Sequence, residues 1–159
     1  GTAAALPCPT VAPPFTGVYA RWQAALGCPK GPAGEVAMAM QVFERGRMFW
    51  RSDTREIYVL TQGAQGGRWR AYPDTWQEGQ PDRDPALQAP PGREQPVRGF
   101  GKLWREQLGG PAAEVGWAQG SEQGYTGRWQ PFAGGLLLLD PEGHPYALFP
   151  DGRWESEGK

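Results

Sequence analysis

The residues of this chain that could do chemistry are few and widely spaced. His144 is the only histidine, and Ser52 and Ser121 lack the nucleophile-elbow context that would pair a serine with it. The acidic residues between positions 74 and 84 offer oxygen ligands of the kind that bind Ca²⁺. Arg83 interrupts them, however, and their spacing matches no calcium loop. An exposed histidine and a solvated charge run are the simpler interpretations.

Glycoside cleavage would need two paired carboxylates, and nothing in the sequence singles out a pair. The acidic side chains available for it in the first half are Glu35, Glu44, Asp53 and Glu56. A phosphate-binding loop and a dinucleotide fingerprint are both missing. We therefore predict that the protein is no enzyme and uses neither cofactor nor metal. A small glycan hydrolase is the least favoured of three functions, after the two binding functions given at the end of this section.

Aromatic side chains are the stronger candidates for binding. The chain has eight Trp, and those near turns or strand ends are flanked by Arg, Gln or Asp. Such rings can stack on a sugar or capture a partner, although a small domain also uses Trp simply to fill its core. We assign Trp22, Trp50, Trp104 and Trp117 to the core, and the candidate ligand-binding residues are Trp69, Tyr72, Trp76, Trp129 and Trp154.

Two cysteines, Cys8 and Cys28, lie near the N-terminus. A disulfide between them would tie a Pro-rich leader onto the first of the two repeats described below and would contribute about 3 kcal/mol by lowering the entropy of the unfolded chain. Two buried free thiols are the alternative, and one histidine is too few for a zinc site. A disulfide persists only in an oxidising compartment, and residues 1–5 resemble the start left by signal-peptide removal. We therefore predict a secreted or envelope protein.

Composition limits the class of partner. The formal net charge is −1 with both signs interspersed, so no basic stripe is present and nucleic acid is an unsuitable partner. No apolar stretch is long enough to span a bilayer. The 24 Gly and 17 Pro predict many turns between short strands, with the aromatic residues as the buried core.

The chain matches itself at a shift of 89 residues, which places Gln41 on Gln130 and Phe43 on Phe132. Each copy reads as a short helix, at 17–26 and 100–108, followed by apolar runs bounded by turn residues. The predicted strands are 47–51, 56–61 and 67–72, then 135–140, 145–149 and 153 onward. The predicted fold is therefore α+β and strand-rich, with two pseudo-symmetric repeats that each hold a helix and a three-stranded antiparallel meander.

The predicted boundaries follow from this pattern. A Pro-rich leader covers 1–16, the first repeat 17–72, a Pro-rich connector 73–99 and the second repeat 100–159. The pattern fits one domain and two domains equally.

The first copy resembles the LGFP repeat of bacterial cell-envelope proteins. The residues that carry the resemblance are Leu26-Gly27-Cys28-Pro29, Phe43-Glu44-Arg45-Gly46, Met48-Phe49-Trp50 and Ile57-Tyr58-Val59. The second copy departs from the pattern, because Ala118 replaces the Pro and Leu139 the Trp. The resemblance implies an extracellular role at the cell wall or envelope and no catalytic residues.

We expect a secreted, non-catalytic binding or adhesion module that recognises cell-wall glycan or another polysaccharide. The alternative is a protein-interaction or structural subunit of an envelope assembly, an oligomer or a filament, in which exposed strand edges pair with a neighbour.

Overall fold

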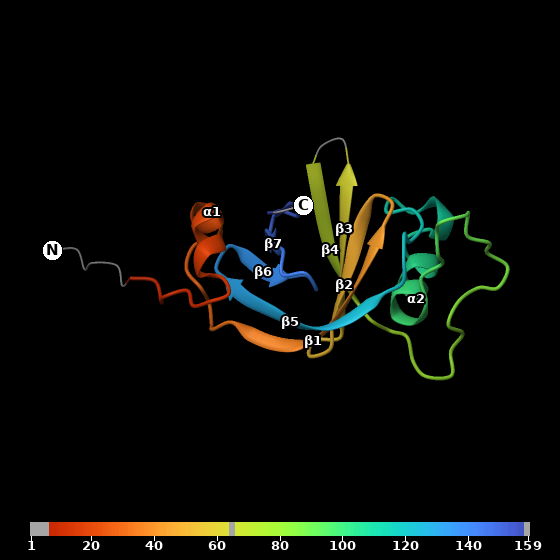
Figure 1. The fold of residues 1–159 in the computed structure, drawn as a ribbon, viewed down its shortest axis with the longest axis horizontal. Helices are drawn as coiled ribbons and strands as arrows, with labels where there is room; N and C mark the ends of the chain where they lie inside the picture. Colours follow the sequence, from red (N-terminus) through yellow and green to blue (C-terminus); the bar gives the residue numbers. More distant parts are fainter. Residues whose placement is uncertain (1–6, 64–65, 158–159) are drawn as a thin grey trace.

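The computed structural model describes residues 7–63 and 66–157. Within these ranges the chain forms two α-helices, one short 3₁₀ helix and eight strands (Figure 1). In chain order the elements are α1 (Thr16–Leu26), β1 (Gly34–Phe43), β2 (Gly46–Arg51), β3 (Glu56–Gly63), β4 (Gly66–Pro73), α2 (Arg98–Glu106), η1 (Gly110–Ala112), β5 (Gln123–Phe132), β6 (Gly135–Leu139), β7 (Pro145–Leu148) and β8 (Trp154–Ser156).

All eight strands belong to one antiparallel sheet, in the order β4-β3-β2-β1-β5-β6-β7-β8. The sheet curls so that its outer strands, β4 and β8, approach each other and nearly close a barrel. Arg68 and Arg153 form a single bridge across this seam, and the Trp69 amide donates to the Gly152 carbonyl at 2.9 Å. Because the strands pair with their neighbours throughout, most backbone polar groups of the sheet are satisfied within it.

The predicted fold class is wrong. The protein is not two helix-plus-three-strand units; its helices are short additions to one continuous, mostly antiparallel sheet. The two strands that the sequence prediction missed, β1 and β5, pair with each other from Gly34–Trp129 to Met40–Gln123 and join the halves of the sheet. The centre of the molecule is therefore the region that was predicted to be loop.

Composition explains why β1 and β5 were missed. β5 contains Gly124, Gly127 and Pro131, and β1 contains Gly34, Ala37 and Ala39, residue types that are depleted in strands. In the sheet the small residues have a packing role. A Cβ added to Gly34 would lie 2.9 Å from the ring of Trp129, so a larger residue at this position would displace the indole.

The core consists of three clusters. Side chains from all eight strands fill the barrel interior, among them Met38, Phe49, Tyr58, Leu138 and Trp154. A second cluster lies between α2 and the outside of β1–β3, with the fully buried Trp104 at its centre. A third lies beneath α1 and includes Phe15, Leu26 and Phe132. Each helix thus covers apolar strand residues that face out of the barrel.

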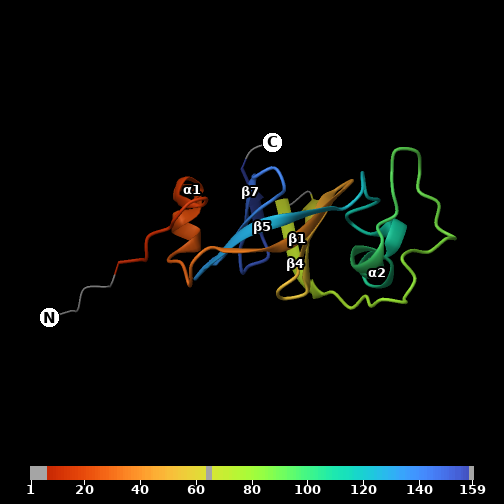
Figure 2. The same cartoon turned by 60° about the horizontal axis from the view of Figure 1, so that its bottom comes forward.

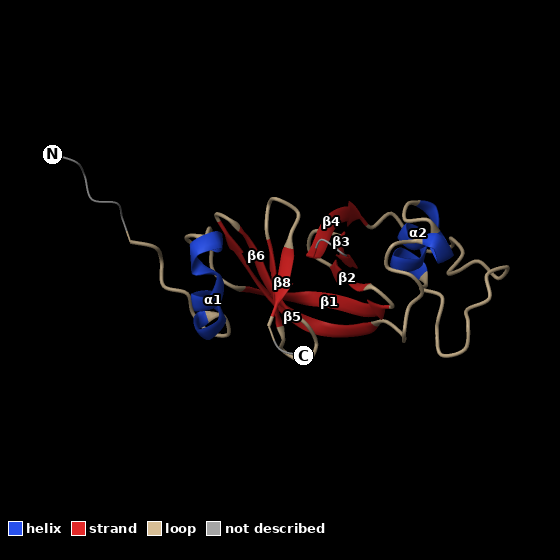
Figure 3. Ribbon diagram, turned by 90° about the horizontal axis from the view of Figure 1, so that it is seen from above, coloured by secondary structure: helices blue, strands red, loops and turns tan. Residues whose placement is uncertain are grey.

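The helices lie at opposite ends of the molecule (Figures 1 and 3). We call these regions the α1 end and the α2 end. At the α1 end, the Ala133 and Gly134 amides of the β5–β6 turn donate to the Cys28 and Leu26 carbonyls, and the Lys30 amide donates to the Pro131 carbonyl. At the α2 end, the Glu44 and Arg45 amides of the β1–β2 turn donate to the Trp117 and Val115 carbonyls, and the Gln119 amide donates to the Val42 carbonyl.

The same shift of 89 residues relates these bonds, since Glu44 corresponds to Ala133 and Trp117 to Cys28. The shift continues through β2 and β6 but fails beyond them. Trp50 pairs with Ile57, whereas Leu139 pairs with Pro145, so the second connection is one residue shorter. Alignment of the last strands by a constant shift would therefore place their side chains on the wrong face.

The predicted disulfide is confirmed, because Cys8 and Cys28 are bonded with their Cα atoms 5.1 Å apart. The bond fastens the leader to Cys28, two residues after the end of α1. Val11 and Phe15 of the leader are buried at this end of the molecule. Neither described helix is long and apolar enough to cross a membrane.

Candidate functional site

The connector between β4 and α2 gives the α2 end a covering that the α1 end does not have. It runs as a long loop outside α2 (Figure 2), and Glu94 of the loop forms a bridge with Ala118, which lies before β5. The Arg98 amide donates to the Asp82 carbonyl at 2.8 Å, and the Glu94 amide donates to the Ala118 carbonyl at 2.9 Å. These bonds hold the two sides of the loop against the core. Three hollows lie along the connector; two of them also contact β1, and the third, lined by Trp76 and Arg83, lies between the connector and α2.

The first hollow, which we call the aromatic hollow, has a volume of about 460 Å³. Its floor includes the two small residues Ala37 and Ala39 of β1. Three aromatic rings surround it, from β2, the connector and α2, and polar groups stand at its rim. The side chains that line it include Trp50, Trp76, Phe100, Asp74 and Glu122, whereas the Tyr125 ring packs in the barrel interior.

Trp76 is held in place by its backbone and its indole. Its amide donates to the Asp74 carboxylate at 3.1 Å, and its Nε1 donates to the Pro81 carbonyl at 3.2 Å. The ring is half-buried, so one part of its surface remains open to a ligand. Trp50 is also half-buried, and its Nε1 is a buried donor without a partner among the described residues.

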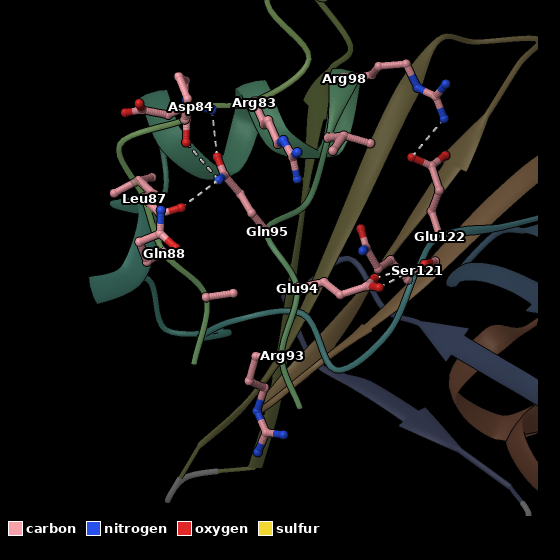
Figure 4. A pocket seen from close by; sticks show the side chains of 14 residues that line it. Arg83, Asp84, Leu87, Gln88, Arg93, Glu94, Gln95, Arg98, Ser121 and Glu122 are labelled. Atoms are coloured by element: carbon pink, nitrogen blue, oxygen red, sulfur yellow. Dashed lines mark hydrogen bonds and ion pairs between the residues drawn. The ribbon is translucent and has the colours of Figure 1, made fainter. Parts of the chain in front are cut away.

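The second hollow, the polar hollow, is larger, at about 660 Å³ (Figure 4). Connector residues form most of its wall, and Gln41 of β1 and Ser121 complete it. On one side, the Gln95 side chain joins two parts of the connector. Its Oε1 accepts from the Asp84 amide at 2.8 Å, and its Nε2 donates to the Asp84 carbonyl at 3.0 Å. On the other side the Ser121 hydroxyl donates to the Glu94 carboxylate at 2.9 Å.

One ion pair separates the hollows. Arg98 Nη2 lies 3.3 Å from Glu122 Oε1, and both residues line both hollows. Arg98 begins α2 with a φ of 51°, a left-handed conformation that is uncommon for residues other than Gly. Glu122 immediately precedes β5. The pair therefore sits where the helix and the central strand meet.

A second ion pair anchors the connector. Glu44 Oε2 lies 2.9 Å from Arg93 Nε, and Glu44 Oε1 accepts the Trp117 amide at 2.9 Å. The amide hydrogen bond, followed by the bond to Arg93, lowers the pKa of Glu44 from its ordinary value. The β1–β2 turn is thus bound through one carboxylate both to the loop after α2 and to the connector.

The candidate ligand-binding residues predicted from sequence lie in three places. Trp76 lines the aromatic hollow. Trp69, Trp129 and Trp154 belong to the cluster inside the barrel. Tyr72 packs on the cluster beneath α2 and lines a separate groove with Leu108 and Val115.

Specific contacts hold the three interior indoles. Trp69 Nε1 donates to the Phe149 carbonyl at 2.8 Å, and Trp154 Nε1 donates to the Thr61 carbonyl at 2.9 Å, both across the seam of the barrel. The Arg51 guanidinium covers the ring of Trp129 at 4.1 Å. Arg51 is itself only 6% exposed and donates to Asp53 and to the Tyr58 hydroxyl. Of the five predicted residues, Trp76 alone lies in the aromatic hollow.

Sequence reasoning missed most of the other lining residues. Trp50 was assigned to the core, whereas it packs on the core with part of its ring and lines the hollow with the rest. Gln41 gave a usable signal, because the shift of 89 residues matches it to a second glutamine, Gln130, within an otherwise diverged segment. Arg98 and Glu122 gave none, since only the folded chain brings them together.

The volumes of both hollows fall in the range of small-ligand sites. The aromatic hollow combines aromatic walls with a few polar groups, whereas no aromatic side chain of the described ranges lines the polar hollow. Among the described residues no group of three His, Cys, Asp or Glu side chains could hold a metal ion. His144 lines neither hollow. It contacts Asp140 in the turn after β6, with 3.4 Å between His144 Nδ1 and Asp140 Oδ2.

In comparisons with models of protein families, with curated proteins and with solved structures, none matches this chain.

Proposed function

We propose that the protein is a non-catalytic, secreted module that binds polysaccharide, and that the aromatic hollow holds one sugar ring against Trp76. The observation that carries the proposal is the half-open Trp76 ring above a floor of small residues, with Asp74 and Glu122 beside it. An aromatic face takes the apolar side of a sugar, and carboxylates accept hydrogen bonds from its hydroxyls.

The setting of Trp76 favours a role in binding over one in stability. Its indole contacts the connector and lines the hollow, whereas the interior indoles donate across the barrel seam. A pre-positioned Trp with two fixed χ angles loses little entropy on binding, which is why such residues dominate binding energy. A location outside the cytosol is supported by the Cys8–Cys28 bond, which persists only under oxidising conditions.

The test is retention on insoluble glycans. Wild-type protein should be retained on at least one of cellulose, chitin and peptidoglycan, and Trp76→Ala should bind about tenfold more weakly or worse, corresponding to about 1.4 kcal/mol. Trp76→Phe, which keeps an aromatic face, should retain most of the affinity. Trp22→Phe changes an aromatic residue at the α1 end, 4% exposed, and serves as the matched control with unchanged binding.

Absence of retention on all three glycans would refute the proposal. Under that outcome the protein-interaction alternative gains support, and light scattering would then be expected to show an oligomer or a co-purifying partner.

A further inference from the structure

We infer that the polar hollow is a second subsite for the same ligand, and that it takes an uncharged, hydroxyl-rich unit next to the one on Trp76. The ligand is then an oligosaccharide chain that crosses the Arg98–Glu122 pair, and binding strengthens with chain length. This inference rests on the proposed function and adds the number of subsites and the charge class of the ligand.

The first support is continuity. The two hollows share Arg98 and Glu122, so a molecule that fills one touches the wall of the other. The shared ion pair has a 3.3 Å separation, and both partners are partly exposed, 51% for the Arg98 side chain and 25% for Glu122. An exposed pair of this kind contributes little to stability by itself, and its donors and acceptors remain available to hydroxyls that pass over it.

The second support is a buried acceptor in the wall. Gln41 is 3% exposed and lines the polar hollow. Its Nε2 donates to the Gly120 carbonyl at 2.8 Å, but its Oε1 has no hydrogen-bond partner among the described residues. A buried polar atom without a partner costs free energy. A hydroxyl that reaches the base of the hollow would supply the missing donor.

Gln130 shows which part of this feature is structural. Its Nε2 donates to the Gly31 carbonyl at 3.1 Å, and its Oε1 is equally without a partner. Gln130 corresponds to Gln41, and Gly31 to Gly120, by the shift of 89 residues. It lines neither hollow. The amide bond to the loop and the unpartnered Oε1 are therefore common to both ends, and of the two glutamines only Gln41 lines a hollow.

The third support is charge balance. Three arginines and three carboxylates line the polar hollow: Arg83, Arg93, Arg98, Asp84, Glu94 and Glu122. Arg93 and Arg98 are in ion pairs, while Arg83 has no ion pair among the described residues and points into the hollow (Figure 4). Asp84 and Glu94 also have none, so a polyanion would gain Arg83 but would face two unpaired carboxylates. An uncharged ligand meets donors and acceptors of both signs without that repulsion.

The experiment is a titration series by calorimetry. Cello-oligosaccharides and chito-oligosaccharides, from dimer to hexamer, are the uncharged probes, and oligogalacturonate of matched length is the acidic one. Affinity should rise at least tenfold with length within an uncharged series and should exceed that for the acidic chains. Arg83→Ala removes an exposed side chain and should weaken binding of the long chains about fivefold while leaving dimer binding unchanged.

Matched variants separate ligand contact from folding. Gln41→Met should also lose affinity for long chains, whereas Gln130→Met, which breaks the corresponding amide bond at the α1 end, should not. Arg21→Ala changes an exposed arginine at the α1 end and is the charge control. Equal affinity for all lengths, or wild-type affinity in both Arg83→Ala and Gln41→Met, would overturn the second subsite.

These outcomes are distinct from failure of the proposed function. If Trp76→Ala abolishes binding but length and Arg83 have no effect, the aromatic hollow acts alone and only this inference falls. Tighter binding of the acidic chains would overturn the charge class. If no glycan binds at all, both proposals fall together.

Discussion

The α1 end and the α2 end use the same backbone hydrogen bonds but are completed by different side chains. Where Trp117 lies at the α2 end, Cys28 lies at the α1 end and is bonded to the leader. Where Glu44 binds the connector through Arg93, the α1 end has Ala133. The comparison indicates that one end is closed covalently and compactly, while the other is held by polar contacts that leave hollows along the connector.

The helices show the same contrast. Trp104 Nε1 of α2 donates to the Gly116 carbonyl at 2.8 Å, and the Tyr19 hydroxyl of α1 donates to the Gly27 carbonyl at 2.7 Å. Gly116 and Gly27 correspond by the 89-residue shift. Trp104 is fully buried and contacts Trp117, whereas Tyr19 is half-buried and stacks on Phe132. Trp104 therefore contributes a large buried side chain to the core of the α2 end, whereas the α1 end is stabilised by its core and by a disulfide.

The largest expected effect comes from Trp104→Ala. Removal of a fully buried indole should lower the free energy of unfolding by about 3–5 kcal/mol, as measured by urea denaturation. Tyr19→Ala should cost clearly less, because the side chain is already partly exposed and the disulfide still holds its end. Equal losses in the two variants would show that the ends do not differ in this way.

Removal of the disulfide should have the next largest effect. The double variant Cys8→Ser with Cys28→Ser should lose about 3 kcal/mol of stability, because the unfolded chain regains the entropy of the closed loop. Amide hydrogen exchange should then accelerate in α1 and the leader but not in α2. Acceleration at both ends would mean that the bond stabilises the whole barrel and not the α1 end alone.

The smallest effect concerns pH. The folded-state pKa of Glu44 lies below its ordinary value of 4.5, so its ionised form stabilises the fold above that pH. As the pH falls through the folded pKa, this contribution disappears. Glu44→Gln should therefore be less stable than wild type at neutral pH, and the two should converge in acid, as followed by denaturation midpoints.

Glu35→Gln is the control for that comparison. Glu35 is 61% exposed in its pair with Arg128, at 3.5 Å, and such surface pairs contribute little. Its unfolding should match wild type across the same pH range. A pH-independent difference between Glu44→Gln and wild type would contradict the assignment of the Glu44 contacts.

Part of the structure could be predicted from local sequence. The helices begin near Gly17 and Phe100 because apolar residues recur there at helical spacing and glycines follow. Strands β2, β3 and β6 are runs of large apolar residues, which local propensity identifies. β1 and β5 could not be identified in this way, since their Gly, Ala and Pro content favours loops.

The candidate site was less predictable than the fold. Trp76 was predicted as a ligand-binding candidate because it lies near a turn and has polar neighbours. Trp69, Trp129 and Trp154 have similar flanking residues, yet they lie inside the barrel. What separates them from Trp76 is the closure of the sheet, which depends on pairing between strands far apart in the sequence.

The sequence by itself indicated the disulfide, both helices, the strands other than β1 and β5, and the relation between the ends, because each depends on residue types or on spacing along the chain. Only the tertiary structure decided that the halves form one sheet, which indoles are enclosed, and that Arg98 and Glu122 divide two hollows. These features depend on contacts between distant segments, where a glycine such as Gly34 matters for the ring it admits and not for its own propensity.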